Sequence, residues 1–584
     1  SEEVWLYGYR GMRHDAAVLF ALEELQRAVG RGVRAYKHAR KTQTHKDWGQ
    51  AHTIFSGLLD TINFLSLPSS LEVLKNPKER LAQKTSARTL RLAKVLPKQL
   101  LALKISNRDR LAHIAGALGH IEEAIDLRKA LIADYTKHGQ PAQVARSQQT
   151  LGVIYAKVGN TEAAREAFKE CAVVSQRAKL LPREAGCRSK LAGKHRELFN
   201  YQAAIEQYLV AIQLFETLQS PQQAQPRRHL GLLYESSLSD YDRALEQFEA
   251  ALQWVGPDGK GLSLWADLQI DIARIHRQRA QYSRAQSKIR AVREHAEQLP
   301  YQQRATEILV SARIDWYRGD YPNARKSQQR ALQIARRAGD RFLEIQARSL
   351  AGLIALNQGM LSRASDEITG ALELARSTRR QQEEAIQLNN LGFVMRESGR
   401  SKTAIKYFQQ ALNLEKKRGN KEGIAYALRN LGDAWSKLGE LGMATSHLGK
   451  ALEMSRAIGN RYNELQCMLA IAEVLARQSS PNARGAYERS SELGQQLGVL
   501  EVVWRSYYGL ARLATRSNDH TKARENIERA VTTAERLGRG GASGTSGRSR
   551  DELYMDAFSI AITQQDLAGA FRYIERLHGR RLLD

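Results

Sequence analysis

The side chains able to do chemistry are scattered along this sequence without the spacing that catalysis needs. Its three cysteines, Cys171, Cys187 and Cys467, lie far apart and include no CxxC pair. The 14 histidines show no metal-ligand spacing, and there is no HExxH, GxSxG, phosphate-binding loop or kinase signature. Paired carboxylates such as Glu383 and Glu384 have nothing to orient them. The sequence therefore predicts a chain that is not an enzyme and that holds no metal and no cofactor.

The cysteines are better explained by packing. Free cysteine behaves as a small hydrophobe, and Cys171 stands where other segments of the chain carry alanine. We expect all three to be buried free thiols. Their odd number and wide spacing argue against a disulfide scaffold or a zinc ribbon and fit a reducing, cytoplasmic compartment. No apolar run approaches the roughly 20 residues that a membrane-spanning helix needs.

The elements that position these side chains repeat with a period of forty residues from about residue 105 onward. An alanine recurs at intervals of 39 to 47 residues from Ala124 to Ala570, usually four residues before an aromatic or aliphatic side chain. A glycine often precedes it by five residues, as at Gly399, and a small residue by about twelve, as at Gly392. Small residues let two helices approach closely, and glycine ends the first of them. Since one helical hairpin cannot bury both faces, each must stack on its neighbours.

This pattern resembles the tetratricopeptide repeat. It is clearest in Leu151, Gly152, Tyr155, Gly159, Ala164 and Phe168, and again in Leu391, Gly392, Gly399, Ala404, Phe408 and Ala411. The resemblance covers residues 105–584 and implies an all-α fold, a right-handed α-solenoid of about 12 stacked hairpins. Because the period is 40 rather than the usual 34, we expect the second helix, or the turn between repeats, to be longer by about a turn and a half.

Both ends of the chain depart from the period. The expected divisions are an irregular basic helical cap at 1–104, the array at 105–537, a flexible Gly/Ser linker at 538–550 and a last helical hairpin at 551–584. Within the cap, Pro68, Pro77 and Pro97 are expected to break the helices.

The last hairpin carries a second resemblance. Its residues run Ala570-Phe571-Arg572-Tyr573-Ile574-Glu575-Arg576 and end in Arg580-Arg581-Leu582-Leu583-Asp584. They resemble the junction at which long bacterial tetratricopeptide arrays meet a CHAT domain, a caspase-like cysteine peptidase fold. The resemblance implies that the catalytic His and Cys of such a domain follow Asp584 and match no cysteine of this chain. It also implies that the array controls an attached or associated caspase-like peptidase.

The first helices of the repeats should line the concave side of the solenoid. The candidate groove residues are Asn389, Asn390, Arg396, Arg429, Asn430 and Asp433, with Arg274, Arg277 and Arg313 in earlier repeats. An asparagine amide offers a donor and an acceptor that match a peptide group, although it would equally bridge neighbouring helices. The arginines lie next to Trp316 and Tyr317 and would suit an acidic peptide or a carboxylate. The alternative is an ordinary solvated helix face.

Charge adds a further alternative. The chain has 89 Lys and Arg against 62 Asp and Glu, a formal net charge of +27. Much of the excess lies in the cap, where residues 27–46 hold seven basic side chains and no acid. Such a cluster attracts nucleic acid or an acidic partner, although arginine-rich composition alone would produce it. Three functions follow: a scaffold that captures a protein or peptide, the sensor part of a bacterial signalling or transcription regulator, or a nucleic-acid-binding solenoid.

Overall fold

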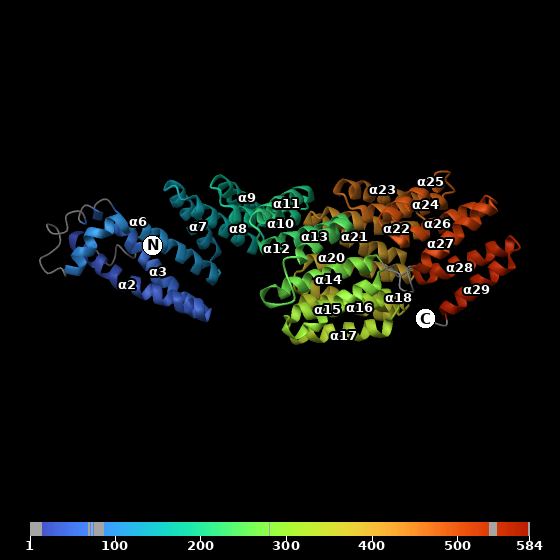
Figure 1. Cartoon of the computed structure of the whole chain (residues 1–584), viewed down its shortest axis with the longest axis horizontal. Coiled ribbons are helices and arrows are strands. Elements are labelled where there is room, and N and C mark those ends of the chain that lie inside the picture. The colour runs from blue at the N-terminus through green and yellow to red at the C-terminus, as the bar shows by residue number, and fades with distance from the viewer. Residues whose placement is uncertain are drawn as a thin grey trace. The chain divides into compact units, whose positions relative to one another are not determined.

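The computed structural model describes residues 14–67, 70–71, 74, 87–279, 281–536 and 546–581. The elements of these residues are helices, and they fall into two compact units, Ser1–Gln219 and Ser220–Asp584 (Figure 1). Consecutive helices pack as hairpins, and the hairpins stack. The predicted all-α solenoid is confirmed within each unit. Among the described helices, none is long and apolar enough to cross a membrane.

The first unit contains eight labelled helices, which begin with the cap. They are α2 (His14–Thr42), α3 (His45–Leu65), α6 (Ala87–Leu118), α7 (Ile121–Lys137), α8 (Pro141–Lys157), α9 (Thr161–Arg177), α10 (Leu181–Glu197) and α11 (Tyr201–Thr217). Helices α2, α3 and α6 share one core around Trp48 and Phe55. The side-chain amide of Asn107 on α6 donates to the carbonyl oxygen of Phe55 at 2.8 Å. The cap is therefore built from long helices.

The prediction that Pro97 breaks a helix is wrong. Residue 97 lies inside α6, which continues for 32 residues. A proline within a helix costs about 3 kcal/mol because it removes one hydrogen bond and crowds the preceding turn. Burial of Leu96, Leu100 and Leu111 in the core shared with α2 and α3 opposes that cost. Pro68 and Pro77 lie outside the described residues.

The second unit continues the array. Its first helices are α12 (Ala224–Leu233), α13 (Tyr241–Leu252), α14 (Leu262–Gln278), α15 (Tyr282–Glu294), α16 (Tyr301–Tyr317), α17 (Tyr321–Arg337), α18 (Arg341–Asn357), α19 (Leu361–Ser377) and α20 (Gln381–Glu397). They are followed by α21 (Ser401–Arg418), α22 (Lys421–Leu438), α23 (Leu441–Ile458), α24 (Arg461–Arg477), α25 (Ala483–Gln496), α26 (Leu500–Arg516), α27 (His520–Arg536), α28 (Ser546–Thr563) and α29 (Leu567–Arg581). Short 3₁₀ or π segments occur at Pro221–Gln223, Tyr234–Leu238, Gly259–Gly261 and Ala296–Gln298.

The forty-residue period consists of two equal helices. Helices α18 and α19 have 17 residues each, and the residues at 358–360 form the turn between them. Gly359 ends α18 with a φ of +73°, a conformation that glycine adopts without strain. The two helices of this hairpin are therefore equal in length. A lengthening of the second helix, or of the turn between repeats, stays a prediction.

The small residues allow the close helix contact that the pattern predicts. A β-carbon at Gly392 would lie 2.3 Å from Cε1 of Phe408, and one at Gly231 would lie 2.5 Å from the same atom of Phe248. The recurrent alanines are buried, including Ala404 at 0% exposure. The aromatic ring of the second helix thus rests directly on the backbone of the first. This contact explains why the two positions repeat together.

The region of the expected Gly/Ser linker is only partly described. Residues 538–545 lie outside the described part of the chain, whereas Ser546–Arg550 already form the first turns of α28. Helices α28 and α29 then pack as the last hairpin. Leu582, Leu583 and Asp584 of the proposed junction lie outside the described residues as well.

Candidate functional site: the inner layer of the second unit

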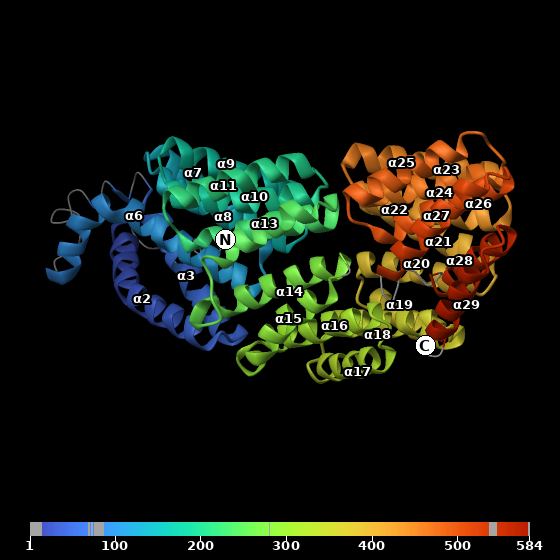
Figure 2. The same cartoon turned by 45° about the vertical axis from the view of Figure 1, so that its right-hand side comes forward.

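The first helix of each hairpin belongs to an inner layer. Helix α18 buries eleven of its 17 residues, whereas α17 buries four. Helix α14 also buries eleven. A helix buried on one face only lies at the outside, so the first helices form the inner layer and the second helices cover it. Figures 1 and 2 agree in placing α17 outside α16.

The two ends of this part of the array come together. A β-carbon at Gly459, before α24, would lie 3.4 Å from Cδ2 of Leu238, before α13. Burial raises the pKa of Tyr241 on α13, and the nearby hydroxyl of Tyr462 on α24 raises it further. Tyr317 on α16 affects both of these tyrosines. Helices far apart in the sequence therefore direct side chains into one interior of the second unit.

The predicted groove asparagines are buried in this layer. Asn430 on α22 is fully buried, and its Nδ2 donates to Oδ1 of Asn389 on α20 at 2.9 Å. Nδ2 of Asn390 donates to Oγ of Ser349 on α18 at 3.1 Å. These are the bonds of helix-bridging asparagines, one of the two roles that the sequence left open. They occupy the amide groups that a bound peptide would need.

Three further predicted residues have neighbours of their own. Arg429 is 9% exposed and stacks over the ring of Tyr426 at 4.5 Å. Burial alone would lower the pKa of Arg429, but Tyr426 and Asp433 hold it above its usual value. Nε of Arg396 donates to Oε1 of Glu397 at 3.1 Å. The structure thus brings Arg429 and Asp433 together and places Arg396 in a separate pair.

Arg274 is fully engaged with acids. Its Nε and Nη2 donate to the two carboxylate oxygens of Glu235 at 3.0 and 2.6 Å, and Nη2 also lies 3.1 Å from Oδ1 of Asp271. Despite burial, Glu235 and Asp271 raise the pKa of Arg274. This is the bidentate geometry that guanidinium groups adopt with carboxylates. Arg274 is therefore a structural residue of the inner layer.

Arg277 and Arg313 have no such partners. Arg277 is 7% exposed, its Cζ lies 4.6 Å from the ring centre of Tyr317, and its Nε has no hydrogen-bond acceptor among the described residues. Arg313 is half-buried, and burial together with the charges of Arg277 and Arg274 lowers its pKa to about 10. Within the described part of the chain, no carboxylate lies within 4.0 Å of either guanidinium.

The comparisons with known proteins bear on the array. Family models of the tetratricopeptide repeat match residues 382–457, and also residues 145–172 and 505–536. The chain contains tetratricopeptide repeats. A search of curated protein sequences found no match. The matched residues confirm tetratricopeptide repeats within the array, and the CHAT junction stays a prediction.

Two solved structures are among those to which this chain is similar. A Rap protein complexed with competence and sporulation factor is 10% identical; the match covers 62% of this chain and 98% of that chain, with a TM-score of 0.43. The apo form of the quorum sensor NprR from B. thuringiensis is 13% identical, with 63% and 99% of the two chains covered and a TM-score of 0.40.

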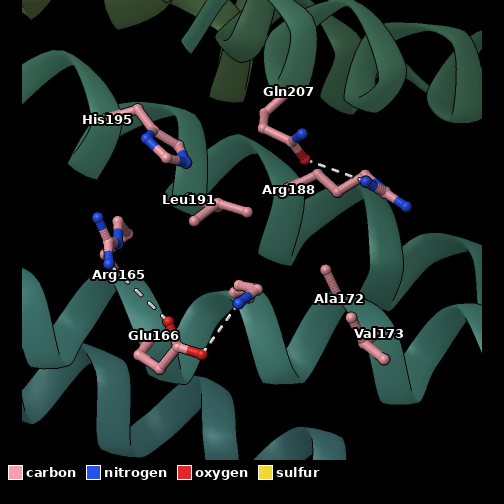
Figure 3. A pocket seen from close by; sticks show the side chains of 9 residues that line it. Arg165, Glu166, Ala172, Val173, Arg188, Leu191, His195 and Gln207 are labelled. Carbon is pink, nitrogen blue, oxygen red and sulfur yellow. Dashed lines mark hydrogen bonds and ion pairs between the residues drawn. The ribbon is translucent and has the colours of Figure 1, made fainter. Parts of the chain in front are cut away.

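A pocket of about 350 Å³ lies between helices α9, α10 and α11 of the first unit (Figure 3). Arg165, Lys169 and His195 line it together with Glu166. Nζ of Lys169 lies 3.2 Å from Oε1 of Glu166, so this charge is paired. Burial and the charge of Arg165 lower the pKa of His195. The sequence pattern did not reveal this pocket because its lining comes from three helices of successive repeats.

A histidine cluster was also missed. Nε2 of His52 on α3 lies 2.9 Å from Oε2 of Glu123 on α7, and Nδ1 of His120 lies 3.4 Å from the same oxygen. One ligand atom from each residue lies within 4.8 Å of the others, which is compatible with a divalent cation. His113 lies outside this cluster and packs against Trp48 with ring centres 5.5 Å apart. Residues 52 and 120 are too distant in sequence for spacing to reveal the cluster.

The prediction of three free thiols is wrong for two of the cysteines. Cys171 on α9 and Cys187 on α10 form a disulfide, with Cα atoms 6.0 Å apart. The packing of these neighbouring helices brings the two side chains together, although they are 16 residues apart. Cys467 is free and buried, and burial raises its pKa to about 12. The cysteines therefore give no support to a reducing compartment.

Proposed function

We propose that the inner layer of the second unit binds a segment of a protein or peptide. The observation that carries this proposal is the convergence of Tyr241, Tyr317 and Tyr462 from α13, α16 and α24. All three residues are half-buried. Tyrosine is common at binding surfaces because it offers a large apolar face and a polar hydroxyl at low entropic cost.

The stacked repeats suit an extended ligand. Each inner helix adds a few side chains to a continuous surface, so a segment lying along it contacts several repeats at once. The polar ladder of Asn390, Asn389 and Asn430 holds neighbouring inner helices in fixed positions. A surface that is already ordered loses less entropy when it binds. Recognition by such a layer needs no catalytic group, which agrees with the absence of catalytic motifs from the sequence.

We propose further that the recognised partner controls a caspase-like peptidase attached to or associated with the array. The support for this context is the resemblance of residues 551–584 to the CHAT junction. The nucleic-acid alternative is weakened at two of the basic side chains of the cap, because Arg27 pairs with Glu23 and Glu24 and Arg31 pairs with Glu24. Such pairs reduce the charge available to phosphates.

Panning tests the binding proposal. A phage-displayed library of short random peptides is applied to the immobilised protein, and retained peptides are synthesised with a fluorescent label for anisotropy titration. We expect Tyr462→Ala, on the inner helix α24, to weaken binding by about tenfold or more. The matched control is Tyr407→Ala on the outer helix α21, which removes another half-buried tyrosine and should leave affinity unchanged. Equal affinities for both variants, or no retained peptide, would contradict the proposal.

A further inference from the structure

The charges of the inner layer do not balance between α12 and α16. Three acids are close together on the inner side: Glu235, Asp267 and Asp271. Arg228 pairs with Asp271 at 2.7 Å and with Asp267 at 2.9 Å. Arg274 pairs with Glu235 and with the second carboxylate oxygen of Asp271. These acids are therefore all committed to Arg228 and Arg274.

Arg277 and Arg313 are the excess charges. With a pKa of about 10, Arg313 remains protonated at neutral pH, next to the equally charged Arg277. A buried charge without a counter-charge is costly, because it loses hydration and gains nothing in return. Nε of Arg277 is buried and has no acceptor among the described residues. Groups held in such an unfavourable state are characteristic of binding sites.

The surroundings of these two arginines are aromatic. The guanidinium of Arg277 stacks on Tyr317, whose ring centre lies 5.0 Å from that of Trp316. Arg277 also lowers the raised pKa of Tyr241, so the Tyr241 hydroxyl lies within electrostatic reach of it. Stacking fixes the plane of a guanidinium and leaves its edge free to donate. The free edge is the part that would bind a planar oxyanion.

We propose that Arg277 and Arg313 hold the carboxylate of an Asp or Glu side chain in the segment bound by the inner layer. This inference rests on the proposed function and adds the chemical class of the ligand. A carboxylate matches two guanidinium donors in one plane and removes the charge excess. The tyrosine rings would cover the methylene groups that carry it.

An acid within the segment fits better than a chain terminus. The inner helices continue on both sides of the two arginines, with α12 before them and α22 after them in the sequence. A segment that ended at Arg277 would leave one of these sides uncovered. The C-terminal carboxylate of a peptide and inorganic phosphate share the anionic chemistry, so they are separate arms of the test.

The test uses the peptides that panning retains on the full chain. We expect them to share an Asp or Glu, and changing it to Asn or Gln should weaken binding to the unaltered protein by about tenfold or more. The double variant Arg277→Met and Arg313→Met should bind acidic and neutral peptides equally weakly. Arg304→Met is the matched control, because Arg304 is exposed on α16, the helix that carries Arg313. It should behave as the unaltered protein.

The outcomes separate this inference from the proposed function. If retained peptides need Tyr462 but lack an acid, binding stands and the carboxylate site is overturned. The same conclusion follows if changing the acid to Asn or Gln lowers the affinity for the double variant as much as it lowers the affinity for the unaltered protein. Loss of binding on amidating the peptide terminus, with the acidic side chain immaterial, overturns it in favour of a chain end. If phosphate displaces the neutral peptide from the unaltered protein but not from the double variant, the carboxylate site is overturned in favour of a phosphate site. If the protein retains no peptide, both proposals fail.

Discussion

Replacement of Gly392 by Ala tests the close contact on which the array depends. The new β-carbon would lie 2.3, 2.6 and 2.7 Å from Cε1, Cδ1 and Cζ of Phe408, all closer than real β-carbons approach other atoms. Phe408 is fully buried and packs edge-on against Phe393 with ring centres 5.5 Å apart, so its ring has little room to move. Overpacking of this kind costs about 1–3 kcal/mol. The gain in helix propensity from glycine to alanine returns about 1 kcal/mol, which leaves a net loss of up to about 2 kcal/mol.

A second glycine supplies the control. Gly449 lies in helix α23, is exposed, and has no atom within 4 Å of where a β-carbon would stand. Gly449→Ala should therefore raise the free energy of unfolding by up to about 1 kcal/mol. Because the propensity gain is common to both variants, the difference between them measures overpacking alone. Urea unfolding followed by circular dichroism gives the two values, and hydrogen exchange shows whether α20 and α21 (Ser401–Arg418) open first. Equal stabilisation by both alanines would refute the assigned contact.

Three further predictions concern polar groups of the inner layer and its rim. Arg313→Met removes an unpaired charge and should raise the free energy of unfolding by on the order of 1 kcal/mol, measured by urea titration; a loss would mean that Arg313 has an acid partner. Asn430→Ala should cost about 1–3 kcal/mol because the amide that it bridges is left buried and unpaired, and unchanged stability would contradict the bridge. Burial alone would raise the pKa of Glu344, but hydrogen bonds from Arg341 and Arg336 lower it. Its ionised form therefore stabilises the fold above about pH 4, so Glu344→Gln should cost about 1–3 kcal/mol at neutral pH, and the difference should vanish as the pH falls through the lowered pKa.

The array could be predicted because its contacts are local and repeated. The pairing of Gly392 with Phe408 joins a small residue to an aromatic one 16 positions later, and the same separation recurs at Gly152 and Phe168. The partners of Arg274 and Arg277 do not follow such a rule. Arg274 finds Glu235 across 39 residues, whereas Arg277, three positions later on the same helix, finds none among the described residues. The sequence therefore indicated that arginines line the inner layer but not which of them are free.

The disulfide and the histidine cluster were not predicted because they, too, do not follow the repeat. Cys171 stands at a position where other repeats carry a small core residue, so packing alone was enough to explain it from the sequence. The disulfide depends on its neighbour Cys187 in the next helix, which the alanine pattern does not indicate. His52 meets His120 and Glu123 because α3 of the cap packs near α7 of the array. That contact depends on the geometry of the irregular cap, which carries no period. Periodicity predicts what repeats, and each of these contacts occurs at one place.

Stability and recognition are separable in the inner layer because neighbouring polar residues are satisfied to different degrees. Asn430 and Arg274 have hydrogen-bonded partners within the fold, so their removal leaves a buried group without a bond and must weaken the protein. Arg277 and Arg313 have no acid partner, so the fold gains nothing electrostatically from keeping them charged. A fold without a ligand is stabilised by replacing such residues with apolar ones, and only a bound anion reverses that preference. The sign of the stability change at Arg313, opposite to the sign at Asn430, therefore distinguishes a residue held for binding from one held for structure.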